Sequence, residues 1–370
     1  MHDIIGEDFG RQTRLFSALK KLKHDIDFFV ADYRKFEKKN MKLHGINIAI
    51  RPFGILYFLS FMKNLYDVLK SYRNFVSGEL KNKKLLSNKK YDVLIATSDP
   101  LWGFIGYIFS KKHKVKFIYD LHDNYETYAT YKLPFFGHIN NFVIKNADLV
   151  TTVSYTLKDK IKNIRKNNVF VIQNGFDDKL FKPLNKAKCR KLLKLPKNGK
   201  IIAYAGTIQR SQGLDILIDA FKNLKNKIGN IYLVLAGKFF RGEDKFIDLK
   251  QDKIIYLGSL PQDKIVLLIN AADVAVVPNP DNDFTRYCFP YKVVEYMACN
   301  IPIVATNIGD ISKLLSKHKD SLCKPNNIND MANKIRIQLN KYRINYRKAA
   351  MSNTWSSIAK KLDKILKQIK

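Results

Sequence analysis

Short apolar runs, rich in β-branched residues, alternate along the chain with longer stretches in which apolar and polar positions mix. In the second half, each run is bounded by Gly, Pro, Asn or Asp, which is typical of buried parallel strands. These runs lie at 201–205, 231–236, 254–257, 274–277 and 301–305. Helical stretches are expected between them at 213–224, 261–271 and 290–299. The alternation predicts a doubly wound domain, in which crossover helices join the strands of a parallel sheet.

The first half shows the same alternation with less regular spacing. Strands are predicted at 24–30, 91–97, 116–119, 149–153 and 169–173. The stretch 53–75 is apolar, aromatic and basic at once, and we expect a helix there. Asn174-Gly175 is a strong turn signal, so a boundary between two domains is expected within 174–196. The last stretch, 354–370, has apolar residues at helical spacing and is expected to form a closing helix.

The charge of the chain is unusual, whereas its size and hydrophobicity are not. Its 370 residues, 46% of them hydrophobic, are enough for two or three globular domains. The formal net charge of +33 leaves two interpretations open. One is a lysine-rich coding bias with solvated side chains; the other is an anionic partner such as nucleic acid, anionic lipid or a phosphorylated substrate. Because no RNA-binding signature or recognition-helix pattern accompanies the charge, we do not expect nucleic acid.

Cysteine usage and the N-terminal sequence predict a cytoplasmic protein. The four cysteines, Cys189, Cys288, Cys299 and Cys323, fit no zinc pattern and no evident disulfide framework. The first residues lack the basic and apolar regions of a signal peptide. The longest apolar run near the start, 54–62, is far shorter than the roughly 20 residues of a membrane-spanning helix. We therefore expect a soluble protein, or one that lies on a membrane without crossing it.

One segment at the start of a predicted helix, 289–298, carries candidate chemistry. Pro290 suits the beginning of a helix, because its missing N–H costs nothing there. Lys292 and Glu295 are three residues apart and so share a face of the helix. A surface ion pair is the plain alternative. The first turn of a helix attracts anions, however, and this one follows a strand end, where open α/β sheets bind ligands.

Two loops after predicted strands carry further candidates. In 205–213, backbone amides at Gly206 and Thr207 together with Arg210 would suit a diphosphate, although a plain strand–helix loop remains the alternative. The loop is not a dinucleotide-binding fingerprint. In 119–126, an apolar strand ends in His122, Asp123 and other carboxylates, which is typical of a cleft-facing cluster. A helix-capping Asp and a structural His are the alternative there.

Taken together, these segments resemble family-4 glycosyltransferases. The resemblance runs from about 91 to about 340 and is carried by an ordered set of segments: 171–177, 203–207, 213–215, 290–298 and 301–306. It implies a GT-B fold, an α/β architecture of two Rossmann-like, doubly wound domains with a cleft between them and a C-terminal crossover helix. We predict an acceptor-side domain at 1–175, a nucleotide-sugar-binding domain at 176–345 and a helix at 346–370 that packs back on the first domain.

The resemblance implies transfer of a sugar from a nucleotide-sugar donor to a glycan or lipid-linked acceptor of the cell surface. By it, Glu295 binds the donor ribose, and Lys292 and Arg210 offset the charge of the leaving diphosphate. His122 and Asp123 are the predicted catalytic residues, which orient the acceptor hydroxyl or take its proton. The donor-binding set is completed by Gly206, Thr207, Tyr287 and Pro290, and the acceptor side by Asp8 and Gly10.

The chain departs from the family pattern at the donor site. Tyr287 stands where the family often has a second glutamate, and Thr207 and Gln212 stand at two often basic positions. Donor phosphates must then be held differently, with Arg210, Lys292 or Arg286 as candidates. A nucleotide-sugar-binding relative without catalysis is therefore the alternative function.

No metal or other cofactor is expected. The triplet Asp281-Asn282-Asp283 matches the D-x-D metal motif of another transferase fold, but such triplets arise often by chance, and GT-B enzymes generally need no metal. The expected partners are the donor, the acceptor and an anionic membrane surface. The stretch 46–73 mixes large apolar residues with Arg and Lys and is the predicted docking segment for the inner face of the cell membrane.

Overall fold

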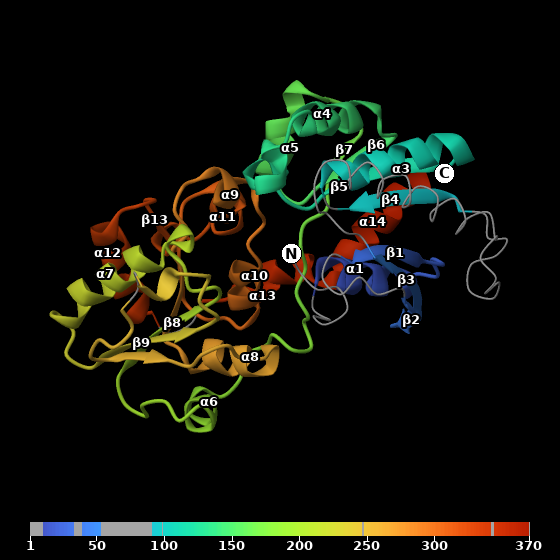
Figure 1. The fold of residues 1–370 in the computed structure, drawn as a ribbon. Coiled ribbons are helices and arrows are strands. Elements are labelled where there is room, and N and C mark those ends of the chain that lie inside the picture. The colour runs from blue at the N-terminus through green and yellow to red at the C-terminus, as the bar shows by residue number, and fades with distance from the viewer. Residues whose placement is uncertain are drawn as a thin grey trace. The chain divides into compact units, whose positions relative to one another are not determined.

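A computed structural model describes residues 10–32, 39–52, 91–97, 99–245, 248–341 and 344–369 (Figure 1). The chain divides into two compact units. Unit 1 comprises Met1–Asp120, Phe135–Val150 and Ala359–Lys370, and unit 2 comprises Leu121–Pro134 and Thr151–Ile358. The domain limits expected from the sequence, at 175/176 and 345/346, stay predictions. The stretch 53–75 and the part of 46–73 beyond residue 52 lie outside the described residues.

Unit 1 combines helices with two kinds of sheet. Its elements are α1 (Arg11–Lys20), β1 (Asp27–Asp32), β2 (Lys39–Leu43), β3 (Ile46–Pro52), β4 (Val93–Thr97), α3 (Pro100–His113), β5 (Lys116–Leu121), α4 (Phe136–Asn146) and β6 (Leu149–Thr152). A three-stranded sheet has the order β1-β3-β2, with β1 parallel and β2 antiparallel to β3. A second sheet has the order β4-β5-β6-β7, and the division between the units falls within its strands β5 and β6.

Helix α3 packs closely on strand β5 because two glycines face it. An added Cβ at Gly103 would lie 2.7 Å from the Tyr119 ring, and one at Gly106 would lie 2.8 Å from the Phe117 ring. The helix begins at a cap in which the Asp99 side chain accepts hydrogen bonds from the backbone N–H groups of the first turn. Its glycine face is buried, so the opposite face of α3 is left for solvent or a partner.

Unit 2 contains the more regular sheet. Its strands are β7 (Val169–Val171), β8 (Lys200–Ala205), β9 (Ile231–Ala236), β10 (Ile254–Tyr256), β11 (Val274–Val277), β12 (Ile303–Thr306) and β13 (Leu322–Cys323). Its helices are α5 (Tyr155–Lys160), α6 (Lys186–Leu192), α7 (Leu214–Lys225), α8 (Gln262–Ala271), α9 (Asp283–Tyr287), α10 (Tyr291–Ala298), α11 (Gly309–Leu314), α12 (Ile328–Leu339), α13 (Arg347–Ala350) and the start of α14 (Trp355–Ile369). Short 3-10 helices lie at Tyr125–Thr127, Ala129–Lys132, Ile161–Asn163, Arg210–Gln212, Glu243–Lys245, Lys319–Ser321 and Met351–Asn353.

The six-stranded sheet of unit 2 is parallel and has the order β10-β9-β8-β11-β12-β13. One face packs a fully apolar core against α7 and α12, in which alternate strand residues such as Leu233 and Val276 are buried. The strands that follow β8 in sequence, β9 and β10, lie on one side of it, whereas β12 and β13 follow β11 on the other side. Such a switch point leaves a crevice at the carboxyl ends of the two strands, where open α/β sheets bind ligands.

The predicted fold class is confirmed: the chain is α/β, and its parallel sheets form Rossmann-like domains. Within the described ranges, no helix is long and apolar enough to cross a membrane.

Candidate functional site

Lys292 of helix α10 lies beside the end of strand β8, at the switch point of the unit 2 sheet, and Glu295 follows it three residues later on the same face of the helix. The Lys292 ammonium lies 3.2 Å from the Tyr204 hydroxyl and 4.5 Å from the centre of the Tyr204 ring. Gly206 follows the strand with φ +151°, and a Cβ there would overlap the Lys292 ammonium. Glycine at 206 therefore makes room for the lysine, and Pro290, the N-cap residue of α10, begins the turn that carries it.

Both charged groups of this helix are partly buried, and this burial shifts both pKa values. Burial lowers the pKa of Lys292 to about 8, against the opposing charges of Cys288 and Glu295. Burial likewise raises the pKa of Glu295 to about 7, against the opposing charge of Lys292. Each group is therefore held in an environment that disfavours its ion. A ligand that brings an anion to Lys292 and hydroxyl groups to Glu295 would relieve this cost, which a surface ion pair would not incur.

Arg210 is engaged by a carboxylate. Its Nε lies 3.2 Å from Oε2 of Glu243, and its backbone N–H donates to the same oxygen at 3.1 Å. The guanidinium is about half exposed. The neighbouring Thr207 contributes its carbonyl, which accepts a hydrogen bond of 2.8 Å from the Tyr204 hydroxyl. The structure thus places Thr207 in the Lys292 cluster and gives Arg210 an acidic partner that the sequence did not indicate.

The loop after β5 holds His122 and Asp123 through two tyrosines. The Tyr125 hydroxyl lies 2.9 Å from Nδ1 of His122, and the Tyr128 hydroxyl donates to the Asp123 carboxylate. Burial, and then the Asp123 charge, raise the pKa of Cys288 to about 12, and the charge of Lys292 lowers it. Cys288 therefore lies close enough to both Asp123 and Lys292 to feel their charges, which puts the two predicted clusters near one another.

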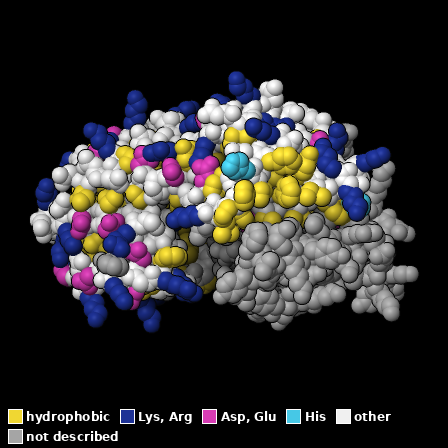
Figure 2. Space-filling view, turned by 45° about the horizontal axis from the view of Figure 1, so that its top comes forward, with side chains coloured by type: hydrophobic (Ala, Val, Ile, Leu, Met, Phe, Trp, Pro, Cys, Tyr) yellow, Lys and Arg dark blue, Asp and Glu magenta, His cyan; other side chains and the backbone are white. Residues whose placement is uncertain are grey.

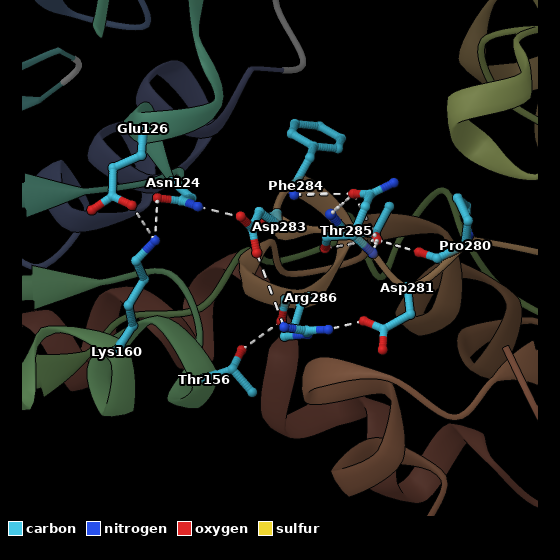
Figure 3. A network of polar contacts seen from close by, with 11 residues as sticks. Asn124, Glu126, Thr156, Lys160, Pro280, Asp281, Asp283, Phe284, Thr285 and Arg286 are labelled. Atoms are coloured by element: carbon cyan, nitrogen blue, oxygen red, sulfur yellow. Dashed lines mark hydrogen bonds and ion pairs between the residues drawn. The ribbon is translucent and has the colours of Figure 1, made fainter. Parts of the chain in front are cut away.

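A polar network ties this loop to helix α9 (Figure 3). The Asn124 side chain donates to the backbone carbonyl of Asp283 at 3.2 Å. The Lys160 ammonium donates to Oδ1 of Asn124 at 3.4 Å and pairs with the Glu126 carboxylate. The same ammonium lies 4.6 Å from the centre of the Tyr287 ring. Lys160 therefore holds the loop that carries His122 and Asp123, and it engages the tyrosine predicted for the donor site.

Helix α5 docks on the same segment through its first turn. The Ser154 and Thr156 hydroxyls donate to the backbone carbonyls of Tyr287 and Arg286. The buried Asp310 carboxylate accepts from the backbone N–H groups of Tyr155 and Thr156, at 3.0 and 3.2 Å. Asp310 thus caps the N-terminus of α5 although it is distant in sequence, and its negative charge interacts favourably with the positive end of the helix dipole.

The D-x-D triplet is used in forming α9. The Asn282 side chain caps the helix through a reciprocal capping box with Thr285. Asp281 pairs with Nε of Arg286 at 2.9 Å, and Asp283 lies 4.0 Å from the same guanidinium. These partners agree with the interpretation of the triplet as loop chemistry. In the part of the chain that the structure describes, no group of three or more His, Cys, Asp or Glu side chains is arranged to hold a metal ion.

On the predicted acceptor side, Asp8 lies outside the described residues, and Gly10 is the N-cap residue of α1. The next residue, Arg11, is buried and forms an ion pair of 3.1 Å with the buried Asp120 at the end of β5. Sequence reasoning missed Arg11. It also missed Tyr204, Lys160, Cys288 and Asp310, although Tyr204 and Cys288 are adjacent or close in sequence to predicted residues.

Comparison with known proteins gives two family matches that follow one another along the chain. Residues 13–180 match the model for Glycosyltransferase Family 4, and residues 185–361 match the model for Glycosyl transferases group 1. An uncharacterized glycosyltransferase of Methanocaldococcus jannaschii is 23% identical over 331 residues, which cover 88% of this chain and 83% of that protein. Lipopolysaccharide 1,2-N-acetylglucosaminetransferase of Salmonella typhimurium is 27% identical over 158 residues, 40% of each chain.

Solved structures show the same architecture. The Anabaena HepE protein in complex with UDP aligns with a TM-score of 0.70 and 18% identity, covering 93% of this chain and 100% of that chain. At this identity the likeness concerns the fold alone, and it confirms the predicted GT-B architecture.

Proposed function

Since this chain belongs to the group 1 glycosyl transferases, with a family-4 first half, we propose that it transfers a sugar from a nucleotide-sugar donor to a cell-surface glycan or lipid-linked acceptor. The observation that carries the proposal is the partly buried Lys292 beside Gly206 at the switch point of the unit 2 sheet, with the partly buried Glu295 on the same face of α10. Burial removes water from the charged groups of Lys292 and Glu295. These groups therefore suit a ligand that offers an anion to the lysine and hydroxyl groups to the glutamate, and a nucleoside diphosphate sugar has both. The UDP complex of the Anabaena relative supports a donor of this class.

In the proposed donor site, the Glu295 carboxylate accepts hydrogen bonds from the two vicinal ribose hydroxyls. Lys292 and the backbone N–H groups of the first turn of α10 bind the diphosphate, whose charge grows as it leaves. Arg210 joins them when the diphosphate competes with Glu243 for its guanidinium. Because these groups supply the positive charge that the leaving group needs, the proposed reaction requires no metal ion.

In the proposed transfer step, the bond between the donor anomeric carbon and the diphosphate oxygen breaks. A bond forms between that carbon and an acceptor hydroxyl oxygen, and the hydroxyl proton passes to a base. His122, hydrogen-bonded to Tyr125, and Asp123, hydrogen-bonded to Tyr128, are the proposed groups that orient the hydroxyl or take its proton. Gly10 and Asp8 remain the proposed acceptor-side residues.

We assign the acceptor to the cell surface on two grounds. The Salmonella relative is named for lipopolysaccharide, a surface glycan. The net charge of +33 suits a protein that works at an anionic membrane from the cytoplasmic side. The acceptor, the membrane and the location are parts of the proposal.

The experiment that tests the donor site is a thermal-shift screen across UDP-, GDP- and ADP-sugars. A donor at about 100 times its Kd stabilises the fold by about 2.7 kcal/mol, so the right nucleotide should give a clear rise in Tm. Glu295→Gln serves as the control that should show a much smaller rise. If no nucleotide sugar and no nucleoside diphosphate shifts the Tm, the proposed function is wrong.

Turnover separates the enzyme from a non-catalytic relative. With the donor found in the screen, the wild-type protein should release nucleoside diphosphate, whereas His122→Ala and Asp123→Asn should bind the donor and release far less. Donor binding without any release by the wild-type protein, in the presence of membrane extract as acceptor source, would favour the non-catalytic alternative.

A further inference from the structure

The outer faces of helices α3 and α4 in unit 1 expose large apolar side chains. Phe135, which precedes α4, is 73% exposed, Phe142 in α4 is 41% exposed, and Ile108 in α3 is 39% exposed. The Phe142 ring packs edge-on against the rings of Phe104 and Tyr107, with centroids 6.0 and 5.2 Å away. These five side chains form what we call the α3–α4 surface. A soluble chain gains nothing from exposing such a set, so a partner is expected there.

The stretches of sequence that form this surface contain lysines and no acidic residues. No Asp or Glu occurs at 100–119 or at 127–147, the stretches that contain α3 and α4. The exposed lysines of unit 1 in these stretches are Lys111, Lys112, Lys114, Lys116 and Lys145. Figure 2 shows a broad hydrophobic patch on the side of the molecule that carries α3 and α4, with Lys and Arg side chains and a few Asp or Glu side chains near it.

The arrangement of these residues suits a lipid bilayer better than a protein. Lys111 follows Tyr107 by one helical turn and lies 5.4 Å from the centre of its ring, so apolar and cationic groups alternate over short distances. Aromatic rings enter the region between headgroups and acyl chains, while lysine ammonium groups reach the lipid phosphates. Protein–protein interfaces are depleted in lysine, and nucleic-acid phosphates would leave the aromatic rings exposed. The helix dipole favours lysines at the end of α3, but it does not account for Lys114 and Lys116 beyond that end.

We propose that the α3–α4 surface docks unit 1 on a bilayer that contains anionic phospholipid. The inference deepens the proposed function, on which it rests for the lipid-linked acceptor, and it gives the membrane contact a defined place. The predicted docking segment at 46–73 lies largely outside the described residues, whereas the α3–α4 surface does not. Apolar insertion and attraction of lysines to phosphate act together here, since neither alone gives stable binding.

The test is co-sedimentation of the full chain with vesicles of phosphatidylcholine alone and of phosphatidylcholine mixed with phosphatidylglycerol. The charge variant is Lys111→Gln/Lys112→Gln/Lys145→Gln. Its matched control is Lys188→Gln/Lys191→Gln/Lys194→Gln, which removes the same charge from exposed lysines in and after α6 of unit 2. The apolar variant is Ile108→Ser/Phe135→Ser, and its control is Leu192→Ser, because Leu192 is 61% exposed on α6.

Wild-type protein should bind the anionic vesicles and release with added salt, and it should bind neutral vesicles far less. The charge variant should bind roughly 100-fold more weakly than wild type. Each lysine near an anionic surface contributes about a fivefold increase in affinity, and the variant removes three lysines. The apolar variant should also lose binding, and both α6 controls should keep it. Equal losses in the α3 and α6 variants would overturn the proposal in favour of nonspecific attraction, and so would wild-type binding that ignores lipid charge.

The donor-induced rise in Tm, measured on every variant, separates this proposal from the proposed function. The variants leave the donor site intact, so they should fold and show the wild-type rise. If wild type binds and turns over donor but binds neither kind of vesicle, the proposed docking surface is wrong, whereas the proposed glycosyltransferase function is kept. A different outcome is that wild type binds no vesicles and self-associates in sedimentation velocity. If Ile108→Ser/Phe135→Ser abolishes that self-association, the surface binds a second copy of the chain and the proposal is overturned.

Discussion

Replacing Glu295 with Gln should stabilise the empty protein and weaken donor binding at the same time. A carboxylate in a purely structural ion pair would show the opposite effect on stability, because its removal strands a buried lysine. Burial raises the pKa of Glu295 from the ordinary 4.5 to about 7 in spite of the charge of Lys292. The ionised side chain therefore destabilises the folded state, and an amide of the same shape removes that cost.

The size of the effect follows from the pKa. A folded-state pKa of about 7 against an ordinary value of 4.5 corresponds to a cost of about 3 kcal/mol when Glu295 is fully ionised. For a raised carboxyl pKa, the favourable state is the protonated one, so the cost is absent below 4.5 and complete only above about 7. The Gln variant also deprives Lys292 of an attractive charge, which makes 3 kcal/mol an upper value for the gain.

The assay is thermal unfolding of wild type and Glu295→Gln at about pH 5 and about pH 8. At the lower pH the two Tm values should nearly coincide, and at the higher pH the variant should unfold up to about 5–10 °C later. Its donor affinity should fall by roughly ten- to a hundredfold, the worth of a hydrogen bond to a charged group. Asp244→Asn, at an exposed carboxylate of the same unit, is the control and should shift neither value. A variant less stable than wild type at both pH values would refute the reasoning.

Three further substitutions test the neighbourhood of this pair. Gly206→Ala places a Cβ where the Lys292 ammonium lies, so donor affinity should drop at least about tenfold in a Tm-shift titration, and an unchanged affinity would place the lysine elsewhere. Lys160→Met releases the loop after β5, so single-turnover rates should fall while donor affinity is kept; a parallel loss of affinity would contradict a role in the transfer step. Glu243→Gln releases the Arg210 guanidinium, so UDP should bind several-fold more tightly by calorimetry, whereas weaker binding would show that the carboxylate positions the arginine.

The strands of the second half were predictable because they are buried on both faces. The runs 231–236 and 274–277 coincide with β9 and β11, since continuous β-branched runs that end at Gly or Pro have few alternatives. The predicted run 301–305 begins too early. Strand β12 starts at Ile303, because Pro302 has no N–H to donate and serves only as an acceptor, for the N–H of Ala275.

The first half was less predictable for two reasons. Strands β2 and β3 form a hairpin in which Leu43 pairs with Ile46 across a two-residue turn. Both turn residues, His44 and Gly45, have positive φ, but His-Gly is a much weaker turn signal than Asn-Gly. Helix α3 has apolar residues on all sides, so its sequence shows no helical period, and this lack of a period is also what leaves the α3–α4 surface apolar.

The candidate site was predictable where it depends on local spacing. Lys292 and Glu295 are three residues apart in one helix, so they share a face of it whatever the tertiary fold. Their proximity could therefore be predicted from the sequence. The partners of Asp310 could not be predicted in this way, because Tyr155 and Thr156 lie more than 150 residues earlier and meet it only when helix α5 packs. Cys288 lies next to a predicted residue, yet the effect of the Asp123 charge on its pKa depends on the placement of a distant loop.

The energetics of Lys292 and Glu295 support the interpretation of this site as a binding site. Lys292, with a pKa of about 8, is charged below that pH, and Glu295, with a pKa of about 7, is charged above that pH, so near neutral pH both groups carry charge that their burial disfavours. Apolar side chains of similar volume would pack at this position without that cost. Elsewhere in unit 2, where Arg190 meets Asp273, the buried arginine also donates to three backbone carbonyls, so its charge is fully used by the fold. A local cost that the contacts of Lys292 with Tyr204 do not offset is expected where a ligand supplies further partners, and a diphosphate joined to a ribose has an anion for Lys292 and hydroxyl groups for Glu295.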